Sequence, residues 1–106
     1  MRLGPLERRV LEALWRRASS ARVRDLQSSF PDIAYTTLMT TLDRLYRKGV
    51  LDRVFERRAF SYRPCRTRAE AALSFLLDEV GTVDDATLSE LERLVRERRR
   101  ALKERS

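Results

Sequence analysis

Histidine is absent from this 106-residue chain, and cysteine occurs only once, as Cys65. A single thiol cannot form an internal disulfide, and without histidine there is little basis for a structural zinc site. The three glycines are too scattered to form a phosphate-binding loop. No serine or cysteine has a base at the spacing that nucleophilic catalysis requires. We therefore expect no metal site, no cofactor and no enzymatic activity.

Long apolar runs are also missing. The longest, Ala71 to Leu77, is interrupted by Ser74 and is far shorter than a membrane-spanning helix. The N-terminus enters an arginine-bearing segment without the apolar region and cleavage site of a signal peptide. These absences predict a folded cytoplasmic protein with no membrane partner.

Positive charge is abundant but unevenly distributed. Residues 1–64 carry 14 Lys and Arg against 7 Asp and Glu, a net of +7, whereas residues 65–106 carry 9 against 9. Such an excess on one domain is typical of nucleic-acid binding, although a merely solvated surface can carry the same charge. We expect a DNA-binding domain over residues 1–64 and a helical segment over residues 65–106.

Three helices are predicted in the first part. Pro5 opens the first, whose apolar stripe comprises Leu6, Val10, Leu11 and Leu14, with Trp15 at its edge. A short second helix is expected over residues 23–30, closed by Pro31. The third spans Tyr35 to Lys48 and stops at Gly49. Short second and third helices joined by a tight turn are typical of a helix-turn-helix.

Beyond the third helix, apolar residues recur at every second position, which is the spacing of a β-strand. Phe60 and Tyr62 alternate with polar residues after the charged tip Glu56-Arg57-Arg58, and Pro64 ends the strand. This pattern predicts a β-hairpin with two arginines at its turn. The expected fold is therefore mainly α with a small β-hairpin, a winged helix-turn-helix followed by a short C-terminal helical dimerisation segment.

The third helix has two distinct faces at 100° per residue. One carries Leu38, Thr41, Leu42 and Leu45, and the other carries Thr36, Thr40, Asp43, Arg44 and Arg47. Threonine lets a helix approach DNA closely, because its hydroxyl can bond a base edge and its methyl can contact thymine. The residues expected to contact bases are Tyr35, Thr36, Thr37, Met39 and Thr40.

Arginine and lysine follow the threonines, at positions where phosphates come within reach. The residues expected to contact the DNA backbone, directly or from the hairpin wing, are Arg44, Arg47, Lys48, Arg53, Arg57 and Arg58. The alternative is that the threonines only populate a solvated surface, but they would then lower helix propensity with no gain in packing.

The C-terminal part contains two amphipathic helices, with capping-box patterns at Thr67–Glu70 and Thr87–Glu90. Because the domain they could cover is small, we expect a partner chain to cover them. The residues expected at this homodimer contact are Leu73, Leu76, Leu77, Val80, Leu88, Leu91, Leu94, Val95 and Leu102. The basic stretch of Arg96, Arg98, Arg99, Arg100 and Lys103 either touches flanking DNA or forms a solvated helix end.

Three blocks of the sequence resemble the penicillinase-repressor family, the BlaI/MecI/CopY type of transcriptional regulators. They are Leu3-Gly4-Pro5-Leu6-Glu7 with Val10-Leu11 and Leu14-Trp15, Ala34 to Thr40 running into Arg44-Leu45 and Lys48-Gly49-Val50-Leu51, and Arg58 to Pro64. The resemblance implies a homodimer that binds an inverted-repeat operator and represses transcription. By position, it assigns base contacts to Thr36, Thr37, Met39 and Thr40.

The chain departs from the family pattern after Pro64, where Ala72-Leu73-Ser74-Phe75 follows so closely that a preceding helix is shortened or missing. Ser74-Phe75 lies where protease-controlled members are cut, but lacks their asparagine, and the cysteine cluster of copper-responsive members is absent. A regulatory protease and a small-molecule inducer both stay open as partners. The alternative function is a winged-helix protein-interaction module without sequence-specific DNA binding.

Overall fold

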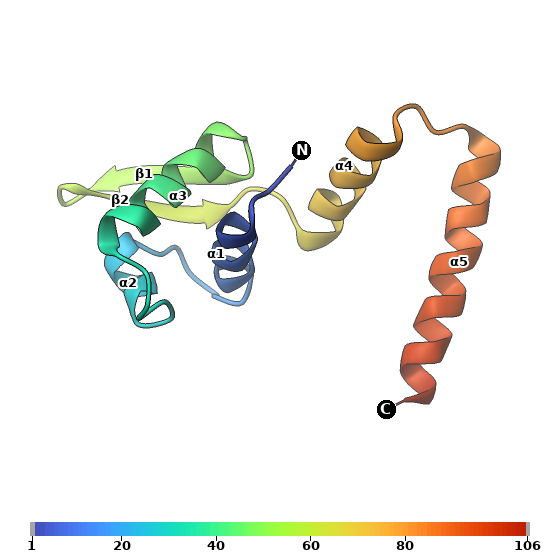
Figure 1. Ribbon diagram of the computed structural model, residues 1–106, viewed down its shortest axis with the longest axis horizontal. Helices are drawn as coiled ribbons and strands as arrows, with labels where there is room; N and C mark the ends of the chain where they lie inside the picture. Colours follow the sequence, from blue (N-terminus) through green and yellow to red (C-terminus); the bar gives the residue numbers. More distant parts are fainter. Residues whose placement is uncertain (1, 106) are drawn as a thin grey trace. The chain divides into compact units, whose positions relative to one another are not determined.

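The computed structural model describes residues 2–105, which form five helices and one antiparallel two-stranded sheet. In chain order the elements are α1 (Pro5–Trp15), α2 (Val23–Gln27), α3 (Tyr35–Arg47), β1 (Leu51–Glu56), β2 (Ala59–Pro64), α4 (Arg68–Val80) and α5 (Asp85–Glu104) (Figure 1). Contacts divide the chain into two compact units, with the boundary within α4 between Phe75 and Leu76.

The core of the first unit lies between α1, α2, α3 and the base of the hairpin. The predicted inner face of α3 is buried, since Leu38, Leu42 and Leu45 are each 0% exposed. They pack with apolar residues of the other elements, namely Val10, Leu11, Leu14, Leu26, Phe30, Val50, Leu51 and Tyr62. Trp15 is half-buried against this cluster, as predicted. The core thereby fixes which face of α3 is left for solvent.

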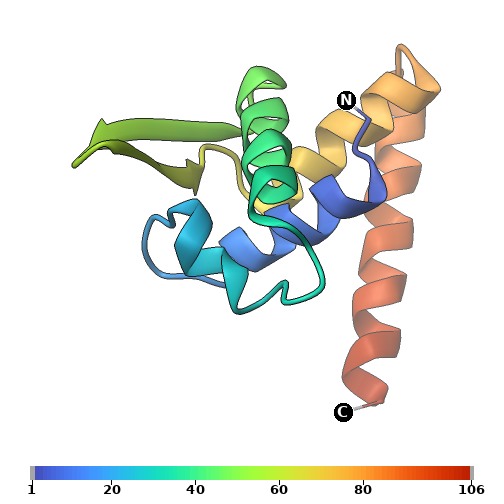
Figure 2. The same ribbon diagram turned by 60° about the vertical axis from the view of Figure 1, so that its left-hand side comes forward.

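The hairpin pairs Leu51 with Pro64 at its base and Glu56 with Ala59 at its tip. It is attached to the loop between α1 and α2 by a reciprocal backbone pair, in which the Ala21 and Tyr62 amides each donate to the other's carbonyl at 2.9 and 2.8 Å. Its tip projects away from the three helices (Figure 2). The three helices and this wing confirm the predicted winged helix-turn-helix.

Two predicted helix boundaries are wrong. α2 ends at Gln27, and Phe30 lies buried in the following turn, where the Gln27 side-chain amide donates to the carbonyls of Phe30 and Ile33. The last helix does not begin at a Thr87–Glu90 capping box. It begins one turn earlier, because the Asp84 carboxylate caps it by accepting from the Thr87 amide at 2.9 Å.

The first unit extends beyond residue 64, the predicted domain boundary. The Trp15 indole N–H donates to the Arg66 carbonyl at 2.9 Å, and the Arg68 guanidinium binds Glu12 at 2.7 Å. The predicted capping box at the start of α4 is confirmed, because the Thr67 hydroxyl and the Glu70 carboxylate each accept from the other residue's amide. The first turns of α4 therefore belong with the helix-turn-helix unit.

Candidate nucleic-acid interface

The outer face of α3 is exposed along the half predicted to contact bases. Tyr35 and Met39 are 51% and 45% exposed, and Thr36, Thr37 and Thr40 are also exposed. Thr41, on the opposite side, is 5% exposed, as the helical-face prediction requires. The residues predicted to contact bases therefore form one continuous solvent-facing surface at the start of a well-anchored helix.

The threonine hydroxyls are oriented by their own helix. The Thr40 hydroxyl donates to the Thr36 carbonyl at 2.9 Å, and the Thr41 hydroxyl donates to the Thr37 carbonyl at 2.7 Å. This bond uses the proton of Thr40 but leaves its oxygen lone pairs available. Thr40 thus presents an acceptor and a methyl group in a fixed direction, a combination that can accept from a base amino group or contact a thymine methyl.

The threonine face forms one wall of a depression of about 460 Å³ whose other wall is the start of α1. Its lining residues are Gly4, Pro5, Leu6, Glu7, Thr36, Thr37, Thr40, Thr41 and Arg44. Glu7 is the carboxylate of this region, and its side chain is only 12% exposed. Burial opposes its ionisation, but hydrogen bonds from Lys48 and from the Gly4 amide outweigh burial and lower the pKa of Glu7.

Lys48 is held by this carboxylate. Its ammonium lies 2.8 Å from Glu7 Oε2 and donates to the Arg2 carbonyl at 2.8 Å. These contacts tie the end of α3 to the start of α1. A phosphate contact by Lys48 would have to compete with these two contacts. Within the structure, Lys48 serves to position α3.

The hairpin turn has an unusual backbone. Arg57 and Arg58 both have positive φ, 52° and 68°, and they alone separate the two strands. A two-residue loop with two left-handed residues is a type I′ turn, which favours Asn-Gly and costs other residues roughly 1 kcal/mol each. Both side chains are exposed at the tip. Arginine at these positions therefore stabilises neither the turn nor the core.

Arg53 connects the wing to α3. Its guanidinium carbon lies 3.9 Å from the Tyr46 ring centroid and 4.0 Å from that of Phe60, between the two rings. Its Nη1 also donates to Asp43 at 3.0 Å. Asp43 bonds Arg47 Nε as well, at 2.8 Å, although that arginine is 77% exposed. Arg53 was predicted to contact DNA, and the structure brings it to the junction of β1, β2 and α3.

The predicted phosphate-contacting residues thus divide into two groups. Within residues 2–105, Lys48, Arg53 and Arg47 have carboxylate partners, whereas Arg44, Arg57 and Arg58 form no ion pair. Tyr46 and Phe60, which hold Arg53, were not predicted as part of the interface. The signal in the sequence was one aromatic residue near the end of the predicted third helix and another in the basic hairpin that follows it.

The residues predicted at the homodimer contact are accessible. Leu73, Leu77 and Val80 of α4 are 51%, 41% and 59% exposed, and α5 buries no residue. Leu76 and Leu91 are half-buried. Among residues 2–105 there is no cluster of metal-binding side chains, and none of the helices is both long and apolar enough to cross a membrane.

Three helices followed by a β-hairpin wing, with one face of the third helix exposed, define a winged helix-turn-helix protein.

A sequence profile of the penicillinase repressor family matches residues 3–91. The chain is also 35% identical over 88 residues to the transcriptional regulator BlaI of Mycobacterium tuberculosis, in two strains. That alignment covers 80% of this chain and 64% of the relative, so the chain spans just under two thirds of its length. The chain belongs to the penicillinase repressor family of transcriptional regulators.

Proposed function

We propose that this protein is a homodimeric transcriptional repressor that binds an inverted-repeat operator and acts in the cytoplasm. The observation that carries the proposal is the exposed threonine face of α3, backed by buried leucines and placed on the same domain as a wing with two arginines at its tip. Membership of the penicillinase repressor family supports the same function.

The start of α3 enters the major groove in this proposal. Tyr35, Thr36, Thr37, Met39 and Thr40 face the base edges, where small side chains permit a close approach of the helix. Arg44 follows one turn later and meets a phosphate. Arg57 and Arg58 reach the neighbouring minor groove or its phosphates from the wing tip.

The second copy of the protein binds the second half-site of the operator. One recognition helix contacts only a few base pairs, so two copies related by a two-fold axis bind an inverted repeat more tightly and more selectively. The exposed apolar residues of α4 and α5 supply the surface for this pairing.

Selection of bound duplexes from a random pool tests the function. We expect enrichment of an inverted repeat, and preferential binding of the enriched duplex over a scrambled one at physiological salt. Thr40→Ala should reduce that preference, whereas Arg57→Ala should weaken binding to all duplexes and flatten its salt dependence. If no sequence is enriched, sequence-specific repression is wrong and the protein-interaction module is favoured. An asymmetric motif would count against the dimer.

A further inference from the structure

α5 leaves most of its apolar side exposed. It spans Asp85–Glu104, is rich in strong helix formers and starts at the Asp84 cap, yet it buries no residue. Its apolar residues remain accessible, with Leu88, Leu94 and Leu102 at 40%, 45% and 56% exposure. An amphipathic helix of this kind gains most of its stability from packing its apolar side against another surface.

The apolar residues of α5 have the spacing of a coiled coil. Leu88, Leu91, Val95 and Leu102 follow the alternating three- and four-residue steps of a heptad repeat, and Arg98 occupies the one remaining position of this seam. Leu94 and Ala101 widen the seam along one side. With Leu102 they line a shallow depression on α5, where alanine leaves space for a larger side chain.

We propose that α5 pairs with α5 of a second copy in antiparallel orientation. The first half of the helix and its cap are acidic, with Asp84, Asp85, Glu90 and Glu92, whereas the second half is mainly basic, with Arg96, Arg98, Arg99, Arg100 and Lys103. A parallel pair would bring like charges together and set Arg98 against its own copy. An antiparallel pair sets each acidic half against a basic half.

In one antiparallel register, apolar residues pack together along the seam and opposite charges lie side by side at its edge. This register packs Leu91 of one copy against Leu102 of the other, and Val95 against the methylene stem of Arg98. On one flank of the seam Glu92 then lies beside Arg99 of the second copy. On the other flank Leu94 lies beside Ala101. Two-fold symmetry repeats each of these contacts.

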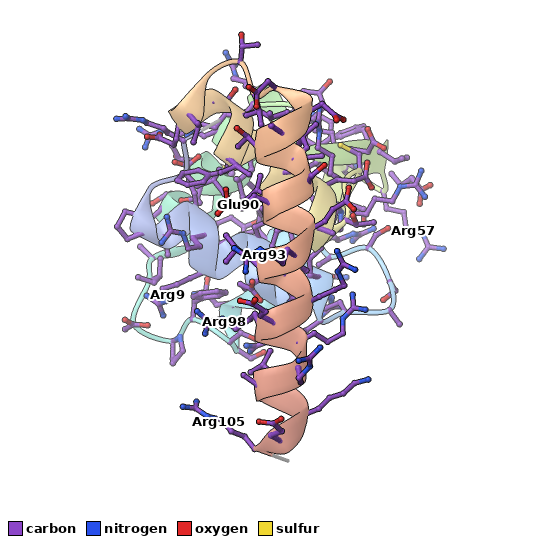
Figure 3. All side chains as sticks on the ribbon, turned by 90° about the vertical axis from the view of Figure 1, so that its right-hand side faces the viewer. Arg9, Arg57, Glu90, Arg93, Arg98 and Arg105 are labelled. Atoms are coloured by element: carbon purple, nitrogen blue, oxygen red, sulfur yellow. The ribbon has the colours of Figure 1, made fainter. Side chains whose placement is uncertain are left out.

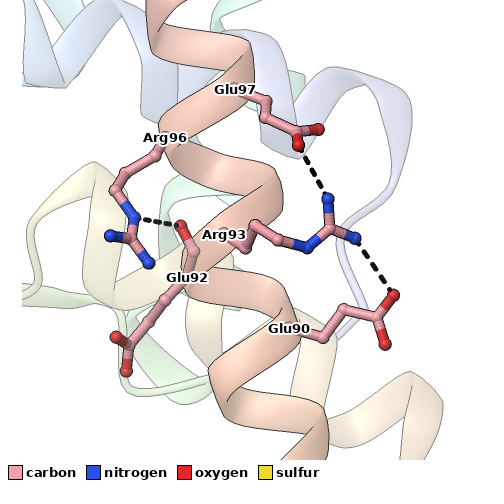
Figure 4. Close-up of polar contacts among 5 residues, drawn as sticks. All are labelled: Glu90, Glu92, Arg93, Arg96 and Glu97. Carbon is pink, nitrogen blue, oxygen red and sulfur yellow. Dashed lines mark hydrogen bonds and ion pairs between the residues drawn. The ribbon is translucent and has the colours of Figure 1, made fainter.

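The opposite side of α5 is already paired within the helix. Arg93 bonds Glu97 at 2.7 Å and Glu90 at 3.4 Å (Figure 4). Glu90, Arg93, Arg98 and Arg105 follow one another along the helix (Figure 3). Since Glu90 and Glu97 already share Arg93 on the outer side, Glu92 and Arg99 are the charges at the edge of the seam that a second copy can pair.

This pairing rests on the homodimer of the proposed function and specifies its contact. The family profile ends at residue 91, so most of the proposed seam lies outside the matched segment. The contact is accordingly inferred from the charges and apolar spacing of this chain.

Charge exchange in the full chain tests the pairing. We expect Glu92→Arg and Arg99→Glu each to raise the dimer dissociation constant about tenfold, because each creates two like-charge contacts per dimer. The double variant should return to within about threefold of the unaltered protein, since exchange restores both pairs. Arg100→Glu is the matched control, because Arg100 lies on the outer side, and should change the constant less than about threefold. Sedimentation equilibrium measures the constants, and circular dichroism checks that helix content is kept.

Spin labels determine the orientation. In a Cys65→Ser background, labels at Ala86 should lie roughly 30 Å apart along the helix axis in an antiparallel pair, and labels at Arg100 only about 10 Å, from the 1.5 Å rise per residue. Equal separations at the two positions indicate a parallel pair and overturn the proposal. A dimer that is insensitive to Glu92→Arg also overturns it, but leaves the homodimer standing. A chain that stays monomeric overturns both.

Discussion

Arg53 of β1 and Asp43 of α3 are joined by an ion pair of 3.0 Å that links the wing to that helix. The arginine is 23% exposed because the Tyr46 and Phe60 rings cover both faces of its guanidinium. A planar cation stacked between two rings and bonded to a carboxylate has a nearly fixed orientation. The wing therefore has a defined position relative to the threonine face of α3.

Arg53→Lys should lower the free energy of unfolding by about 1–2 kcal/mol, because lysine keeps the charge but cannot stack between two rings. Urea denaturation measures this decrease. Arg63→Lys, at an exposed position on the neighbouring strand, is the control and should leave stability unchanged. Equal stability of the two variants would contradict the bracing role of Arg53.

Thr40→Ala should move stability and specificity in opposite directions. Alanine has the higher helix propensity, so the free energy of unfolding should rise by about 0.5 kcal/mol. The preference for the selected duplex should fall about fivefold or more, because alanine cannot make the base contact that we propose for the threonine hydroxyl. Competition binding and thermal denaturation measure the two effects.

Thr82→Ala changes an exposed threonine outside the interface and should alter neither stability nor specificity. Unchanged preference in Thr40→Ala would contradict a base contact.

Replacement of the hairpin turn Arg57-Arg58 by Asn-Gly should stabilise the protein by about 1 kcal/mol, since these residues favour left-handed backbone. Binding to all duplexes should weaken, and the slope of log affinity against log salt should fall by about 2–4, because a dimer loses four arginines and each leaves about one phosphate without a protein cation. The double variant Arg8→Gln, Arg17→Gln removes the same charge from α1 and its C-terminal turn. If it gives the same slope change, the effect belongs to net charge and not to the wing.

Glu7→Gln should destabilise the protein by about 1–2 kcal/mol at neutral pH, because the Lys48 ammonium loses its charged partner. The pKa of Glu7 is lowered by folding, so its stabilisation is complete above its ordinary value of 4.5 and is lost as pH falls through the lowered pKa. The difference between the two proteins should therefore shrink in acid. Urea denaturation at several pH values measures it, with Asp32→Asn as the exposed control. A difference that persists unchanged in acid would show that the Glu7 charge is not its source.

The sequence by itself determined the two faces of α3 and the position of the hairpin. Leucines at helical spacing can be buried on only one side, so Thr36 and Thr40 on the other side had to be exposed, whereas Thr41 shares the buried side. Gly49 ends the helix with a φ of 80°, a conformation that its lack of a side chain permits. These features depend on residues close together in the chain.

Only the tertiary structure decided which charged residues are engaged within the molecule. Lys48 meets Glu7, and Arg53 meets both Tyr46 and Phe60, because packing brings together segments that no local pattern relates. The Asp84 cap was missed since two candidate capping residues lay one turn apart. Local periodicity selects the elements and their faces, whereas the partners of long, flexible cations depend on how those elements pack.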